Sequence, residues 1–236
     1  MFSRWTIPIF IIFLFTAIPV SNFAHADFEK GLEAYNSGDY QTALREWLVD
    51  ANQGDSAAQN NVGTMYAYGF GVPINYAEAA YWYRLAANQG NADAQQALGW
   101  HYINGEGVPQ DYAVAAYWYR LAANQGNAGA QQALGWHYIN GEGVPQDYAE
   151  AMRWFRRAAD QGYAGGQYDL GVMYANGEGV PENDVLAYMW FNLAAARGGE
   201  GASEAKEAKE DLSQKMTAAQ ISEAQRLSTE WLKEHQ

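Results

Sequence analysis

The chain has 236 residues, and its 27 acidic side chains outnumber its 14 basic ones, for a net charge of −13. A protein this acidic is repelled by DNA, RNA and anionic lipid surfaces, which argues against nucleic-acid or membrane-surface binding. It contains no cysteine, which excludes disulfides and a lipid-modified N-terminal cysteine.

Residues 1–26 have the pattern of a secretory signal peptide. Arg4 gives a positively charged start, the run from Trp5 to Val20 is largely apolar, and Ala24-His25-Ala26 matches a small-residue cleavage site. The apolar run is shorter than the ~20 residues of a membrane-spanning helix, and two prolines interrupt it. We expect cleavage after Ala26, no membrane insertion after cleavage, and a periplasmic or secreted mature protein. An uncleaved anchor is the alternative.

Residues 27–54 predict an opening helical hairpin. Phe28 and Leu32 share one face of the first helix, the turn is Ser37-Gly38-Asp39, and Leu44 and Trp47 share one face of the second. Its loop is shorter than the loops that follow, as expected for the terminal unit of a stacked array.

A Gly-x-Gly-Val-Pro motif then recurs every 36 residues, beginning at Gly69, Gly105, Gly141 and Gly177. A fixed period of this size is typical of a solenoid. Residues 88–123 and 124–159 differ at only six of their 36 positions. The differing pairs are Asp93/Gly129, Val114/Glu150, Ala116/Met152, Tyr117/Arg153, Tyr119/Phe155 and Leu121/Arg157.

Each copy predicts two helices separated by a loop. In the second copy we expect a helix over 92–104 that ends with Gly105 in the left-handed conformation, then a helix that Asp111 caps and that ends near Asn124. Asn75 with Glu78, and Asp147 with Glu150, predict full capping boxes. A glycine in the middle of each first helix costs about 1 kcal/mol, so we expect a tryptophan of the second helix to pack across it. The expected pairs are Gly63 with Trp82, Gly99 with Trp118, Gly135 with Trp154 and Gly171 with Trp190.

The L-G-x-x-Y, G-x-G-V-P and A-x-x-W elements at this period resemble the Sel1-like repeat family, relatives of the tetratricopeptide repeat, whose unit has about 34 residues. The resemblance implies an all-α, right-handed solenoid of stacked antiparallel helix pairs, with repeats at 55–90, 91–126, 127–162 and 163–198. The segment 199–236, polar over 201–214 and amphipathic over 217–234, resembles the capping helices of such proteins.

By the same resemblance, the first helices line a concave groove. The four repeats, the predicted signal peptide and the lack of a candidate catalytic group lead us to expect that this groove binds a protein or peptide partner in the cell envelope. Trp100 and Trp136 suit this role, because aromatic anchors supply contact area while neighbouring amides bond a peptide backbone. The alternative is that both indoles pack between repeats. The predicted groove residues are Asn60, Thr64, Gln96, Trp100, His101, Asn104, Gln132, Trp136, His137, Asn140 and Tyr168.

No catalytic or cofactor site is predicted. His101 and His137 recur one repeat apart, but a zinc site needs three or four ligands; we expect surface or groove histidines. Ser203-Glu204-Ala205-Lys206 matches the S-x-x-K motif of penicillin-recognising enzymes without the motifs that accompany it. We therefore expect a monomeric, non-enzymatic scaffold or regulator. A peptidoglycan-binding module and a cell-wall or β-lactam hydrolase are the alternatives.

Overall fold

The computed structural model describes residues 24–199 and 201–235, with side chains from Phe28 onward. The predicted signal peptide, 1–26, lies outside these residues except for its last three, which begin the first helix. Of the helices within the described ranges, none is both long enough and apolar enough to span a membrane.

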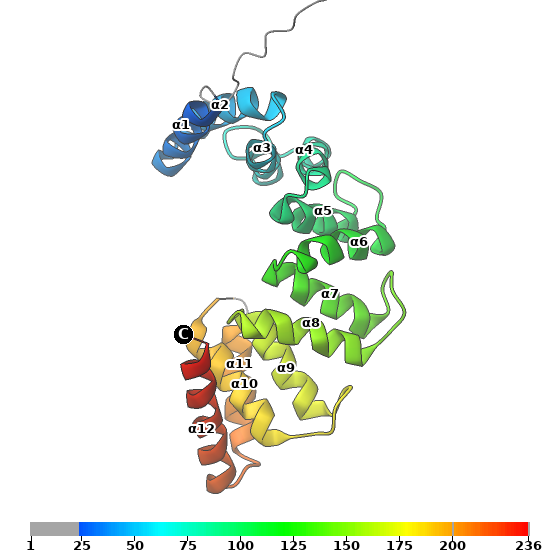
Figure 1. The fold of residues 1–236 in the computed structure, drawn as a ribbon, viewed down its shortest axis with the longest axis vertical. Helices are drawn as coiled ribbons and strands as arrows, with labels where there is room; N and C mark the ends of the chain where they lie inside the picture. The colour runs from blue at the N-terminus through cyan, green and yellow to red at the C-terminus, as the bar shows by residue number, and fades with distance from the viewer. Residues whose placement is uncertain (1–23, 200, 236) are drawn as a thin grey trace, which may run out of the picture.

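The described residues form twelve helices and no strand. Consecutive helices from α1 to α11 pack in chain order along an arc, and α12 packs on α10 (Figure 1). The opening pair is α1 (Ala24–Ser37) and α2 (Tyr40–Asn52). The closing pair is α11 (Ala202–Ser213) and α12 (Ala218–Glu234). Between them lie the four repeats: α3 (Ser56–Tyr68) with α4 (Tyr76–Asn88), α5 (Ala92–Asn104) with α6 (Tyr112–Asn124), α7 (Ala128–Asn140) with α8 (Tyr148–Asp160), and α9 (Ala164–Asn176) with α10 (Asp184–Arg197).

The helices begin and end at the predicted capping residues, with one correction. Gly105 ends α5 at φ 69°, ψ 26°, and Asp111 caps α6 by accepting from two backbone N–H groups at 2.9 and 3.0 Å. The predicted capping boxes do not form as pairs. Asp147 caps α8, but its own backbone N–H, which a capping box would give to Glu150, donates to the Tyr138 carbonyl at 2.9 Å. The Glu150 carboxylate forms an ion pair with Arg153 instead.

The prediction that tryptophans cover the mid-helix glycines is wrong by one residue. A Cβ on Gly99 would lie 2.9 Å from the Tyr119 ring, and one on Gly63 would lie 2.8 Å from Tyr83. The rings of Phe155 and Phe191 occupy the same place against Gly135 and Gly171. The aromatic residue that follows each tryptophan therefore fills the space that glycine leaves, and this close helix contact offsets the low helix propensity of glycine.

Neighbouring repeats meet along two recurring contacts. The second glycine of each loop packs on the preceding repeat: Gly107, at φ +73°, lies against the Tyr76 carbonyl at the start of α4, and Gly143 lies against Tyr112 in the same way. A buried glutamine forms the other contact. Gln95 donates to the Ala87 carbonyl of the preceding repeat at 3.0 Å, and its oxygen accepts from Gln125 at 2.8 Å. These bonds satisfy a polar group that burial would otherwise penalise.

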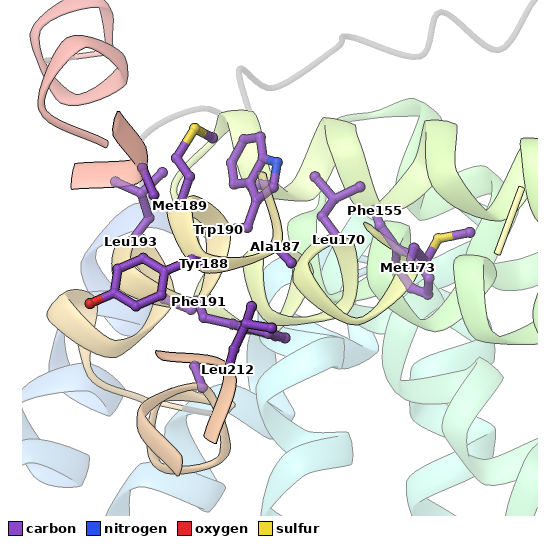
Figure 2. Packing of buried hydrophobic residues seen from close by; sticks show 14 of the residues in the cluster. Phe155, Leu170, Met173, Ala187, Tyr188, Met189, Trp190, Phe191, Leu193 and Leu212 are labelled. Carbon is purple, nitrogen blue, oxygen red and sulfur yellow. The ribbon is translucent and has the colours of Figure 1, made fainter. Parts of the chain in front are cut away.

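The closing helices bury the last repeat. Trp231 and Ala224 of α12 and Leu212 of α11 join one apolar cluster with Trp190 and Phe191 of α10. Figure 2 shows the α10 side chains and Leu212 gathered in this cluster. The closing helices, Ala202–Ser213 and Ala218–Glu234, lie within the segments 201–214 and 217–234, and they pack against the apolar cluster of the fourth repeat.

Candidate functional site

The first helices of the repeats form a continuous surface. Side chains bridge them directly: Gln132 of α7 donates to Asp169 of α9 at 2.7 Å, and Asn127, the N-cap of α7, donates to Asp93 of α5 at 3.0 Å. First helices approach each other in this way when they line the inner side of a curved stack. This surface, formed by α3, α5 and α7, is called the first-helix groove below.

Two indoles stand exposed in the first-helix groove. Trp100 retains 47% of its accessible surface and Trp136 retains 42%, so the exposed aromatics lie one repeat apart on successive first helices. Each has one aromatic neighbour: the Trp100 ring meets His101 edge to face at 5.3 Å between centroids, and the Trp136 ring meets Phe155 at 5.8 Å. Aromatic side chains have only two side-chain torsions, so they lose little conformational entropy when they bind a partner.

A cleft of about 570 Å³ opens between α3 and α5. Predicted residues from both helices line it: Asn60, Thr64, Gln96, Trp100 and His101. Four further wall residues were not predicted. Ile74 and Tyr76 come from the loop and start of α4, while Tyr83 and Tyr119 reach in from second helices, and no local pattern in the sequence marks them as surface residues.

Hydrogen bonds fix part of the cleft wall. The Tyr83 hydroxyl donates to the Thr64 oxygen at 3.1 Å, and Thr64 donates to the Asn60 carbonyl at 3.1 Å. Burial raises the pKa of Tyr83 to about 12, so the hydroxyl stays protonated at neutral pH. Asp93 is the only carboxylate on the wall, and no lysine or arginine lines the cleft among the described residues.

Two predicted amides are already engaged. Asn104 donates to the Trp100 carbonyl of its own helix at 2.9 Å, and Gln132 is held by Asp169. Asn140 is exposed at the end of α7, and Gln96 packs against Gly129 on the next first helix. The side-chain amides of Asn104 and Gln132 are therefore already held by hydrogen bonds within the protein.

The structure corrects the placement of the two histidines. His101 and His137 are each only 2% exposed, beneath the groove surface rather than on it. The Nδ1 of His101 lies 2.9 Å from the Glu106 carbonyl oxygen, and the Nδ1 of His137 lies 2.6 Å from the Glu142 carbonyl oxygen. Burial lowers the pKa of His101, so the ring is neutral at pH 7 and serves as a loop anchor.

Tyr168 lies where the closing helices meet the first helices, and it is half-buried. The start of α11 packs on this part of α9, since a Cβ on Gly201 would lie 3.4 Å from the Tyr168 Cβ, and the Tyr168 ring lies tilted against Phe191. The cap therefore contacts the first-helix surface at the fourth repeat.

Groups with catalytic potential do not converge in the described part of the chain. No three histidine or acidic side chains within it gather as a metal site would require. Ser203 and Lys206 are both exposed on α11, and neither lines the cleft between α3 and α5.

Comparison with known proteins identifies a repeat family. The family model of the Sel1 repeat matches residues 56–91, 92–127, 128–163 and 164–199. A Sel1 repeat protein from Oxalobacter formigenes is similar at 30% identity with a TM-score of 0.68, covering 81% of this chain and 86% of that one. A search of curated proteins returned no match.

Two further solved structures share the fold. The protective antigen c5321 of uropathogenic Escherichia coli, which displays the same repeat fold, matches at 27% identity with a TM-score of 0.57, over 90% of this chain and 54% of that one. A putative Sel1 repeat protein from Klebsiella pneumoniae has 24% identity and a TM-score of 0.52, over 80% and 93% of the two chains.

Sel1 repeat solenoids are generally non-enzymatic scaffolds for protein–protein interaction. The four matched repeats, the helix pairs of about 36 residues and the similar solved structures together show that this chain belongs to the Sel1 repeat family.

Proposed function

We propose that this protein is an extracytoplasmic interaction scaffold that binds an extended segment of a cell-envelope protein in the first-helix groove. The observation that carries the proposal is the pair of exposed indoles: Trp100 lines a cleft of about 570 Å³, and Trp136 lies one repeat further along the groove. The 36-residue spacing of the indoles places one anchor on each of two successive repeats, so a bound segment would cross the repeats.

The chemistry of the cleft defines the segment it suits. Aromatic and apolar walls favour large side chains on the ligand, and ordered amides and hydroxyls can bond its backbone. Asp93 and a neutral His101 leave the wall weakly acidic, so a neutral or basic segment fits it better than an acidic one.

The decisive experiment compares two pairs of exposed aromatics on an array of extended aromatic-containing peptides from envelope proteins. Trp100→Ala/Trp136→Ala removes the groove pair. The control, Tyr81→Ala/Tyr117→Ala, removes two aromatics of similar exposure, also one repeat apart, on second helices. We expect Trp100→Ala/Trp136→Ala to bind the peptides with at least tenfold lower affinity than the wild type. Tyr81→Ala/Tyr117→Ala should bind them with the affinity of the wild type. Equal binding by both variants would refute the groove proposal.

Two further assays test the other ligand classes. Co-sedimentation with peptidoglycan sacculi that depends on Trp100 and Trp136 would assign the groove to glycan rather than peptide. Turnover of a chromogenic β-lactam that Ser203→Ala abolishes would replace the scaffold role with a hydrolase.

The extracytoplasmic setting rests on the predicted signal peptide, and it has its own test. N-terminal sequencing of the protein from the periplasmic or secreted fraction should begin at Asp27. A full-length chain in the cytoplasmic fraction would contradict it. Size-exclusion chromatography with light scattering checks the expected monomer.

A further inference from the structure

The exposed side of α8 is where the third repeat departs from the second. Among the six positions that differ between these copies, Gly129 lies in α7 and Phe155 packs under Gly135. The other four differences share one location, because all of them line a single cleft of about 580 Å³ on α8. They are Glu150, Met152, Arg153 and Arg157.

Three arginines shape this surface, which we call the α8 cleft. Arg153 pairs with Glu150 at 2.7 Å through Nη1, and Arg156 pairs with Asp160 at 2.8 Å through Nε. Arg157 stacks over the Trp154 ring at 4.6 Å. All three arginines remain exposed. A guanidinium carries five N–H donors, so these contacts orient each group while leaving donors for a ligand.

The charge of the α8 cleft contrasts with that of the chain. Three of the 14 basic residues of a protein with a net charge of −13 lie on one helix face. Glu150 and Asp160 offset two of the three arginine charges, which leaves a local net charge of +1. At physiological salt, charges are screened beyond about 8 Å, so a carboxylate of a ligand at α8 interacts with this small positive charge more than with the distant acidic residues. Tyr117 and Leu121 hold the positions of Arg153 and Arg157 in the second repeat, where no such cluster exists.

In the fourth repeat, a helix covers the equivalent face of the second helix. Met189 and Leu193 hold the same register positions on α10, and α12 lies over them. Ser228 of α12 donates to the Met189 carbonyl at 3.3 Å, and Trp231 meets Trp190 at 5.9 Å. This face of a second helix therefore accepts an amphipathic helix.

We propose that the α8 cleft binds an acidic amphipathic helix of a partner protein. Its apolar stripe packs on Met152 and on the Arg157 side chain that covers the Trp154 ring, as the stripe of α12 packs on α10. Its carboxylates pair with Arg153 and Arg157, which stand where α10 has Met189 and Leu193. Arg–carboxylate pairs are directional and can be bidentate, so they fix the register of such a helix. This surface is separate from the first-helix groove and has the opposite charge preference.

The test uses the second repeat as its template. In Met152→Ala/Arg153→Tyr/Arg157→Leu each new residue is the one that the near-identical second repeat already holds at that position, so the fold should be retained, as circular dichroism can verify. The probe is a fluorescein-labelled helical peptide as long as α12, 17 residues, with a leucine stripe flanked by glutamates. Versions with glutamine or lysine in place of glutamate serve as charge controls.

We expect the triple variant to bind the glutamate peptide at least about tenfold more weakly than the wild type, a loss of about 1.4 kcal/mol. Binding to the wild type should weaken as NaCl is raised, and the glutamine and lysine peptides should bind poorly. Trp100→Ala/Trp136→Ala should leave this binding unchanged, which separates it from the groove proposal.

Three results would overturn the inference. They are equal affinity of the wild type and the triple variant for the glutamate peptide, equal affinity of the wild type for the glutamine peptide, and arginine-dependent binding of phosphatidylglycerol vesicles tighter than that of the peptide. The last would assign the cleft to a membrane surface.

Discussion

Replacing Gly107 by alanine should open the junction between the first and second repeats. Gly107 has φ +73°, and a Cβ there would collide with the backbone carbonyl of Tyr76. Left-handed backbone costs alanine about 1 kcal/mol, and overpacking against atoms that cannot rotate away adds about 1–3 kcal/mol. We expect Gly107→Ala to destabilise the protein by about 2–4 kcal/mol.

The same loop provides the control. Gly105 has nearly the same φ, +69°, but a Cβ there meets only Gln110, at an ordinary 3.4 Å. Gly105→Ala should therefore cost only the conformational part, about 1 kcal/mol. Urea unfolding followed by circular dichroism should separate the two midpoints by about 0.5–1 M. If the two variants unfold at the same urea concentration, the backbone contact with Tyr76 does not hold the repeats together.

Three further expectations concern other parts of the solenoid. Gly99→Ala should lower the free energy of unfolding in urea by about 0–2 kcal/mol, because overpacking against Tyr119 exceeds the gain in helix propensity. Gly129→Ala should be neutral or stabilising. A stabilised Gly99→Ala variant would contradict the packing argument. His101 has a lowered pKa when folded, so the unfolded chain takes up its proton first and stability should fall as the pH drops below 6.5; this loss should shrink in His101→Gln, and an unchanged pH profile would count against it. Trp231→Ala should destabilise the cap by about 3–5 kcal/mol and release α12 to proteolysis, while retained protease resistance would show that α12 is held by other contacts.

Sequence predicted the helices because their ends are set by local chemistry. Gly105 ends a helix through its own φ, and Asp111 begins one through its own side chain, so both are visible in a short window. The capping boxes failed because the N–H of Asp147 bonds to Tyr138, a contact that depends on how the loop closes.

The candidate site was less predictable, since its features depend on how helices cross. The periodicity identified the glycine and the helix that covers it, but the crossing of the helices selects Tyr119 rather than Trp118 as the covering residue. His101 shares a helix with exposed Trp100, and only the loop carbonyl of Glu106 shows why it is buried. The α8 cleft did have a visible signal, the clustering of differences between two near-identical repeats.

The loop glycines also bear on how such a chain can evolve. Gly107 and Gly143 rest on main-chain atoms of the preceding unit, and main-chain atoms are the same whatever amino acids surround them. A duplicated unit consequently fits its new neighbour at once, without compensating mutations at the joint. The outward positions of the copy are then free to diverge, and a tyrosine and a leucine can become arginines while the architecture stays intact.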